Sequence, residues 1–102
     1  MSRLDSLRKL VALDPNDPLP HYGVGIELIQ LEQWAEAVAA FDRAITLNPK
    51  YSVAYYHKAR AQIGAGQSDE ARATLTGGRE AARSAGDWHA EGEMRELLES
   101  LA

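Results

Sequence analysis

The chain has 102 residues and a formal net charge of −4, with 45% hydrophobic and 25% charged residues. This length allows one domain with a single core, and the composition is ordinary for a globular protein. The acidic balance and the scattered lysines and arginines argue against a nucleic-acid surface, which needs a clustered basic face. The lack of cysteine excludes a disulfide framework and cysteine-ligated zinc.

The sequence carries no targeting signal. Residues 1–5 lack the apolar run of a signal peptide. No stretch approaches the roughly 20 apolar residues that a membrane span requires. We therefore expect a cytoplasmic protein that does not enter a membrane. The initial methionine and the final helix suit a complete protein.

Apolar residues recur at helical spacing along the whole chain, and no alternating strand pattern occurs. The pattern predicts an all-α fold of antiparallel helices, over residues 2–13, 18–31, 35–47, 52–65, 68–84 and 87–101. In the first helix, Leu4, Leu7 and Val11 share one face. A proline-rich turn follows, in which Asp17 caps the second helix and Pro18 occupies its first turn.

The later helices are bounded by proline, serine and glycine. The second helix is apolar on two adjacent faces, so we expect it to pack against two neighbours. Pro49 follows the third helix, Ser52 is placed to cap the fourth, and Gly66 follows the fourth. In the last helix we expect an apolar face to be buried and four glutamates to point outward. The apolar face holds Met94, Leu97, Leu98 and Leu101, and the glutamates are Glu91, Glu93, Glu96 and Glu99.

The sequence aligns with itself when it is shifted by 34 residues. Residues 12–15 then fall on residues 46–49. Large residues also coincide: Tyr22 falls on Tyr56, Ile29 on Ile63, and Phe41 on Leu75. A period near 34 with two helices per period is typical of a helix-turn-helix solenoid, in which stacked neighbours complete a shared core.

One unit of this period carries a more specific pattern. It reads His21-x-x-Val24-Gly25-x-x-Leu28, then Ala37-x-x-x-Phe41-x-x-Ala44, then Pro49. Large, small and proline residues at these offsets resemble the tetratricopeptide repeat, which usually has tryptophan or another large apolar residue at the position of His21. The second unit resembles the family through Tyr55, Ala59, Ala71 and Leu75. It departs from the family at Lys58 and Gln62, where apolar residues are usual.

The resemblance implies a single domain over residues 1–102, built as a short superhelix of about six helices. Its parts are a half repeat over 1–15, repeat 1 over 18–51, repeat 2 over 52–85, and a capping helix over 86–102. It also implies a function in protein–protein interaction.

No pattern in the sequence predicts catalysis. A nucleophile elbow, a phosphate-binding glycine loop and an H-E-x-x-H helix are all missing from the sequence. His21, His57 and His89 lie about one repeat apart, so a metal site would have to form across helices. We therefore expect no enzymatic activity, no cofactor and no bound metal.

In the family, one face of the first helix of each unit lines a concave groove that holds extended or helical peptides. The resemblance therefore implies a binding site on the matching residues: Tyr22, Ile26, Ile29, Tyr56, Arg60 and Ile63. Tyrosines and an arginine with aliphatic neighbours suit a groove floor, because such residues dominate interface energetics. Alternatively, the first or last helix buries part of this surface.

Family members that grip the C-terminal carboxylate of heat-shock chaperones resemble one another in a lysine and an asparagine on this face. Here Tyr22 and Ile26 stand at the matching positions, and the second unit offers His57 and Arg60. A more apolar peptide, or one with an acidic group near Arg60, fits this surface better than a chaperone tail.

Two functions remain open at this point. The first is an adaptor or scaffold module that binds a protein or peptide partner in the groove. The second is a self-associating, homodimeric subunit of a larger assembly, with the groove or an end helix occupied by another copy.

Overall fold

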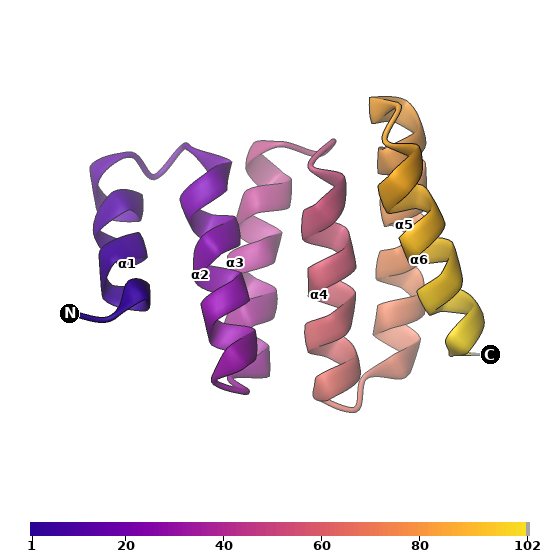
Figure 1. Cartoon of the computed structure of the whole chain (residues 1–102), viewed down its shortest axis with the longest axis horizontal. Helices are drawn as coiled ribbons and strands as arrows, with labels where there is room; N and C mark the ends of the chain where they lie inside the picture. Colours follow the sequence, from indigo (N-terminus) through magenta and orange to yellow (C-terminus); the bar gives the residue numbers. More distant parts are fainter. Residues whose placement is uncertain (102) are drawn as a thin grey trace.

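The computed structural model describes residues 1–101. Within this range the chain forms six helices and no strand, which confirms the all-α prediction. The helices are α1 (Arg3–Leu13), α2 (Pro18–Gln30), α3 (Trp34–Leu47), α4 (Ser52–Gly64), α5 (Ser68–Ala85) and α6 (Trp88–Ser100). Figure 1 shows α2, α4 and α6 nearer the viewer, α3 and α5 behind them, and the two termini at opposite ends of the stack.

Polar side chains cap the starts of α1 and α2, and a glycine ends α5. Ser2 and Asp5 form a capping box at α1, in which the Ser2 hydroxyl accepts from the Asp5 amide at 3.1 Å. The Asp17 carboxylate accepts from the Leu19 amide at 3.0 Å and caps α2, as the sequence predicts. Gly86 ends α5 in the left-handed conformation, with φ 71°.

Ser52 does not cap α4, contrary to the sequence prediction. It is the first residue of the helix and is buried, and Tyr51 occupies the cap position without a side-chain hydrogen bond. The Ser52 hydroxyl donates instead to the Asp87 carboxylate at 2.6 Å, and Asp87 also caps α6. This bond ties the start of α4 to the start of α6.

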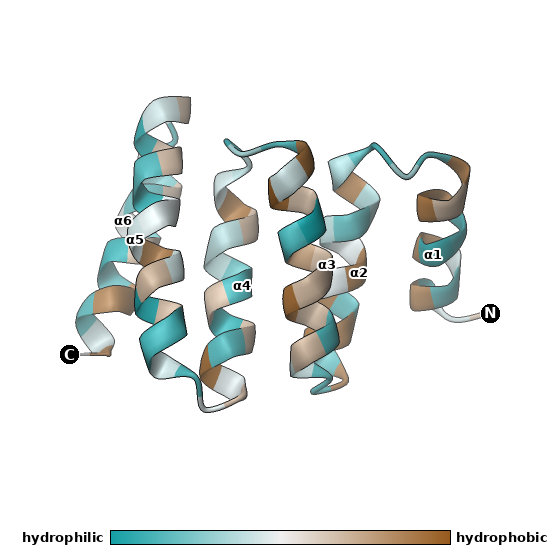
Figure 2. Cartoon of the chain, turned by 180° about the vertical axis from the view of Figure 1, so that it is seen from behind, coloured by the Kyte–Doolittle hydropathy of each residue, from teal (hydrophilic) through white to brown (hydrophobic). Residues whose placement is uncertain are grey.

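The core consists of two clusters that follow the two units of the period. The first lies among α2, α3 and α4 and includes Leu28 and Phe41; the second lies among α4, α5 and α6 and includes Leu75 and Met94. Figure 2 shows that α2 and α3 carry much of the apolar ribbon, whereas α5 and α6 are mostly hydrophilic. The apolar ribbon is therefore concentrated in α2 and α3, the helices of the first unit.

The two polar residues that depart from the family pattern both have polar partners. Gln62 is buried, and its side-chain oxygen accepts from the Thr74 hydroxyl at 2.7 Å. The Lys58 ammonium lies 2.7 Å from the Asp42 carboxylate. Because buried polar groups are costly unless they are hydrogen-bonded, these partners allow polar residues at positions where the first unit is apolar.

Glu91 is buried, so the prediction that it points outward is wrong. Its side chain is 9% exposed, and one carboxylate oxygen accepts from the Arg79 guanidinium at 3.1 and 2.9 Å. Arg83 and Arg95 each lie 3.7 Å from the same carboxylate. These cations lower the pKa of Glu91, with the Arg79 hydrogen bonds as the largest cause. Glu93, Glu96 and Glu99 are exposed, as expected.

Candidate functional site

Aromatic rings from α2, α3 and α4 meet on the α2–α4 side of the stack. The Tyr22 ring lies 5.9 Å from Phe41 and 5.6 Å from His57, centroid to centroid. Tyr51, in the turn before α4, stacks on Tyr22 at 5.2 Å. Tyr56 meets His57 edge-on at 5.2 Å. His57 therefore lies between the two tyrosines that the sequence predicts for the site.

Burial and a neighbouring cation keep His57 neutral. The pKa of His57 falls from its ordinary 6.5 to about 4, chiefly because burial disfavours the imidazolium, and secondly because Arg60 is close. A guanidinium nitrogen of Arg60 lies 3.4 Å from the His57 Nδ1 atom. Burial also raises the pKa of Tyr22, and the charge of Arg60 opposes that rise.

Arg60 is exposed, and no carboxylate of residues 1–101 forms an ion pair with it. Its nearest polar neighbour, His57, is uncharged near neutral pH because of its lowered pKa. The guanidinium is therefore positioned to pair with an acidic group on a ligand.

The structure brings three of the predicted site residues together around His57: Tyr22, Tyr56 and Arg60. Ile29 and Ile63 are half-buried and pack against the first and second core clusters, respectively. Ile26 is also half-buried, and it borders a pocket shared with α1. Tyr22 and Tyr56 are also half-buried and pack against these two clusters, so Arg60 is the one exposed residue among the six predicted ones.

The last helix borders the site at Tyr56. A shallow depression of about 280 Å³ is lined by Tyr56 and by the α6 residues Glu93, Glu96, Leu97 and Ser100. Glu93 and Glu96 are exposed, so an acidic edge faces the ring of Tyr56. The site therefore combines one basic group with an acidic rim.

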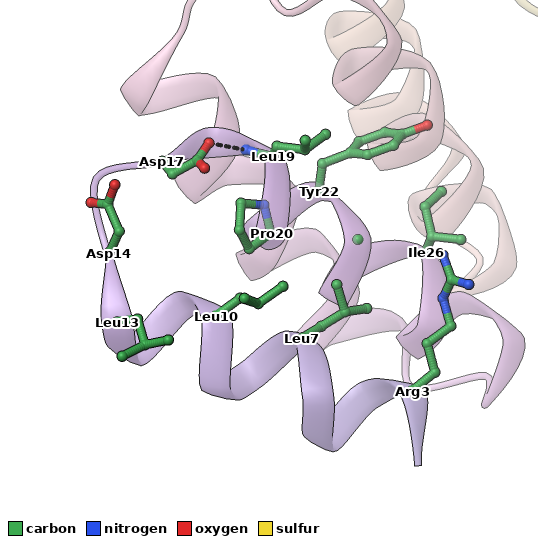
Figure 3. Close-up of a pocket in the computed structure, with 11 residues that line it drawn as sticks. Arg3, Leu7, Leu10, Leu13, Asp14, Asp17, Leu19, Pro20, Tyr22 and Ile26 are labelled. Carbon is green, nitrogen blue, oxygen red and sulfur yellow. Dashed lines mark hydrogen bonds between the residues drawn. The ribbon is translucent and has the colours of Figure 1, made fainter. Parts of the chain in front are cut away.

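A larger pocket, which the sequence analysis did not identify, lies between α1 and α2. Its volume is about 670 Å³, and its lining includes Leu7, Leu10 and Leu13 from α1 and Leu19 from α2. Figure 3 shows Leu7 and Leu10 pointing toward α2, with Asp14 and Asp17 at one end of the pocket and Arg3 at the other. The sequence held a signal for this pocket, namely the leucines of α1. Leucines that stay together at the surface of a helix indicate an interaction site.

Neither a metal site nor a membrane span is found in the part of the chain that the structure describes. No three His, Asp or Glu side chains of residues 1–101 converge to hold a metal ion. None of the helices in this range is long and apolar enough to cross a bilayer.

Comparison with known proteins gives a consistent result. A family model described as tetratricopeptide repeat matches residues 28–90. No curated protein sequence matches the chain. Three solved structures are similar to it over most of their length.

The TPR2B domain of yeast Sti1, in its pHsp70 complex, superimposes with a TM-score of 0.91 at 23% identity, over 96% of this chain and 78% of that one. A protein from Bordetella parapertussis gives a TM-score of 0.85 at 26% identity, over 99% and 88% of the two chains. A tetratricopeptide repeat domain protein from Salinibacter ruber gives 0.78 at 26% identity, over 86% and 89%.

Proposed function

We propose a peptide-binding function for this chain, which belongs to the tetratricopeptide repeat family. The family and the fold support a protein–protein interaction module in general. The proposed site is the aromatic surface of α2 and α4, with Tyr22, Tyr56 and Arg60 as ligand-contacting residues and Ile26, Ile29 and Ile63 as its aliphatic edge. The observation that carries the proposal is the meeting of two tyrosines around neutral His57 with Arg60, which forms no ion pair within residues 1–101.

The chemistry of this surface indicates the kind of segment that it binds. Tyrosine rings offer apolar area and a hydroxyl at low entropic cost, so they favour apolar or aromatic side chains of a ligand. Arg60 favours a carboxylate, and the acidic rim at Glu93 and Glu96 favours a basic residue. We propose a mainly apolar segment with an acidic group that reaches Arg60.

The structural similarity to the Sti1 domain gives no reason to propose that this chain binds a chaperone tail. At 23% identity the similarity shows the fold alone. Tyr22 and Ile26 stand here where carboxylate-gripping members have a lysine and an asparagine, so the first unit lacks the ammonium and the amide that grip such a tail. As the family typically lacks enzymatic activity, we also propose that the chain has none.

Capture of partners from a lysate of the native host tests the proposed function. We expect the double variant Tyr56→Ala, Arg60→Glu to lose at least tenfold in capture of a specific partner, because it removes an aromatic anchor and reverses the only cation of the site. Circular dichroism checks that the variant stays folded. Arg43→Glu is the matched control, because Arg43 is exposed on α3 in the other layer.

Unchanged capture by the folded double variant would exclude this surface as the binding site. Light scattering of the wild-type chain addresses the alternative of a homodimer. A stable dimer that dissociates in the double variant would show that the surface is occupied by a second copy.

A further inference from the structure

The 34-residue period makes α1 the counterpart of α3. Leu7 corresponds to Phe41, and Leu10 to Ala44. Phe41 and Ala44 are fully buried, because α3 packs between α2 and α4. In the described part of the chain α1 packs against α2 and reaches α3 through the ion pair of Arg8 with Glu36, and Leu10 stays 49% exposed. The helix that would cover α1 as α2 covers α3 is therefore missing from residues 1–101.

The pocket between α1 and α2 lies where that helix would pack. Its lining runs along α1 from Arg3 to Leu13, a length of about 15 Å at 1.5 Å per residue. This length suits roughly three turns of a partner helix. Leu13 and Leu19, at the end near the α1–α2 turn, are 82% and 62% exposed.

We propose that this pocket is the docking site for one amphipathic α-helix of a partner protein. The helix packs antiparallel to α1, as α2 packs against α3, and buries Leu7, Leu10 and Leu13. The surface is distinct from the proposed peptide site around His57, although Tyr22 and Ile26 border both. The inference rests on continuity with the α2–α3 interface, whose pattern α1 repeats.

The charges at the two ends of the pocket complement a helix in this direction. The N-terminus of the incoming helix lies beside Asp14 and Asp17, and its C-terminus beside Arg3. A helix carries partial positive charge at its N-terminus and partial negative charge at its C-terminus, so both ends meet the opposite sign. Arg3 already pairs with Glu27 at 2.8 Å, but its side chain is 77% exposed and can still contact a partner.

The α2–α3 interface also indicates the face that the partner helix presents. A Cβ atom at Gly25 would lie 2.6 Å from the Phe41 ring, so that position admits no side chain. In the second unit the corresponding pair is Ala59 and Leu75, both fully buried. Because α1 has Leu7 at this position, we expect the partner to place an alanine against it.

The last helix of a second copy does not meet this requirement. In the 34-residue register α6 corresponds to α2, and Glu93 falls at the position of Gly25. Stacking α6 of one copy on α1 of another would bring the Glu93 carboxylate against Leu7. Burying a carboxylate on an apolar surface is costly, which disfavours head-to-tail stacking of identical chains.

A tethered helix tests whether the pocket accepts one. A second copy of residues 17–34, fused directly before Met1, continues the register and supplies the α2 sequence together with its turn. If it docks, helicity increases and the melting temperature rises by about 5 °C or more, since roughly 1 kcal/mol shifts a domain of this size by that amount. The control fusion carries Gly25→Lys and Leu28→Lys in the appended copy only, and should leave the melting temperature unchanged. Equal effects of the two fusions, or no effect of either, would overturn the proposal.

The same fusion identifies the natural occupant. A partner that uses this pocket should be lost from capture both when the appended helix fills the pocket and when Leu10→Lys places a charge in it. Such a partner should still be captured by the Tyr56→Ala, Arg60→Glu variant. If no captured partner were lost through both pocket changes, the assignment would be contradicted. If light scattering shows a dimer that Leu10→Lys dissociates, the occupant is a second copy and not a partner helix.

Discussion

His57 is the titratable residue most affected by its surroundings. It lies among Tyr22, Phe41 and Tyr56, and a guanidinium nitrogen of Arg60 lies 3.4 Å from its Nδ1 atom. Because its pKa falls from 6.5 to about 4 on folding, the unfolded chain binds a proton at a higher pH than the folded chain does. Its protonation therefore favours unfolding as the pH falls from 6.5 toward 4.

This behaviour gives a prediction for the pH dependence of stability. The free energy of unfolding of the wild type should decrease between pH 6.5 and 5, and His57→Gln should remove most of that decrease. Urea titrations at several pH values measure it. The carboxylates Asp87 and Glu91, whose pKa values are lowered, lose their contributions mainly below this window. Parallel profiles for the two proteins would show that His57 is not protected from protonation.

The positions of some single residues could be predicted from the sequence, and those of others could not. Tyr22, Tyr56 and Arg60 could be predicted together, because the 34-residue period places them on equivalent helix faces. Tyr51 could not, since it lies in a turn and reaches Tyr22 only through the packing of α4 on α2. Glu91 was assigned to the wrong side because the arginines that surround it come from two helices.

Pairs of helices are matched by size at their closest approach. Gly25 faces Phe41 in the first unit, and Ala59 and Leu75 occupy the corresponding positions in the second. The small residue accommodates the larger partner in each case. This complementarity explains why α2 and α3 pack closely although the first unit contains the larger ring.

Alanine substitutions at two glycines test this pairing. Gly25→Ala should destabilise the chain by about 1–3 kcal/mol, because the new methyl group overlaps the Phe41 ring. Gly77→Ala is the control: no atom lies within 4 Å of its added Cβ, and it should stabilise α5 by about 0.5–1 kcal/mol. Thermal and urea unfolding measure both changes. If Gly25→Ala left the free energy of unfolding unchanged, α2 and α3 would have to lie further apart than in this structure.

Helix boundaries were predicted to within one or two residues, because proline, glycine and aspartate mark them locally. The bond from Ser52 to Asp87 was not predictable, since it joins residues 35 positions apart and depends on how α6 returns to α4. The sequence around Ser52 favours a cap at this residue, but its hydroxyl donates to Asp87 instead.

At the scale of the molecule, the two ends of the stack differ in chemistry. The N-terminal end leaves Leu10 and Leu13 exposed beside α2, whereas the C-terminal end presents the glutamates of α6. The period predicted a solenoid, and the family resemblance implied a half repeat at its start and a capping helix at its end. Within residues 1–101 no helix covers α1 as α2 covers α3, and the evidence for this is the exposure of Leu10 (49%) beside that of Ala44 (0%), which the sequence does not give.

Photo-crosslinking can show whether the α2–α4 surface binds a protein segment. A photoreactive amino acid replaces Tyr56 in one version of the chain and Ala73, an exposed residue of α5, in the other. Crosslinking in a host lysate, followed by mass spectrometry, reads out the attached segment. We expect one specific, mainly apolar segment attached at position 56 and none at position 73. The same products from both positions, or a specific product from position 73 alone, would contradict this expectation.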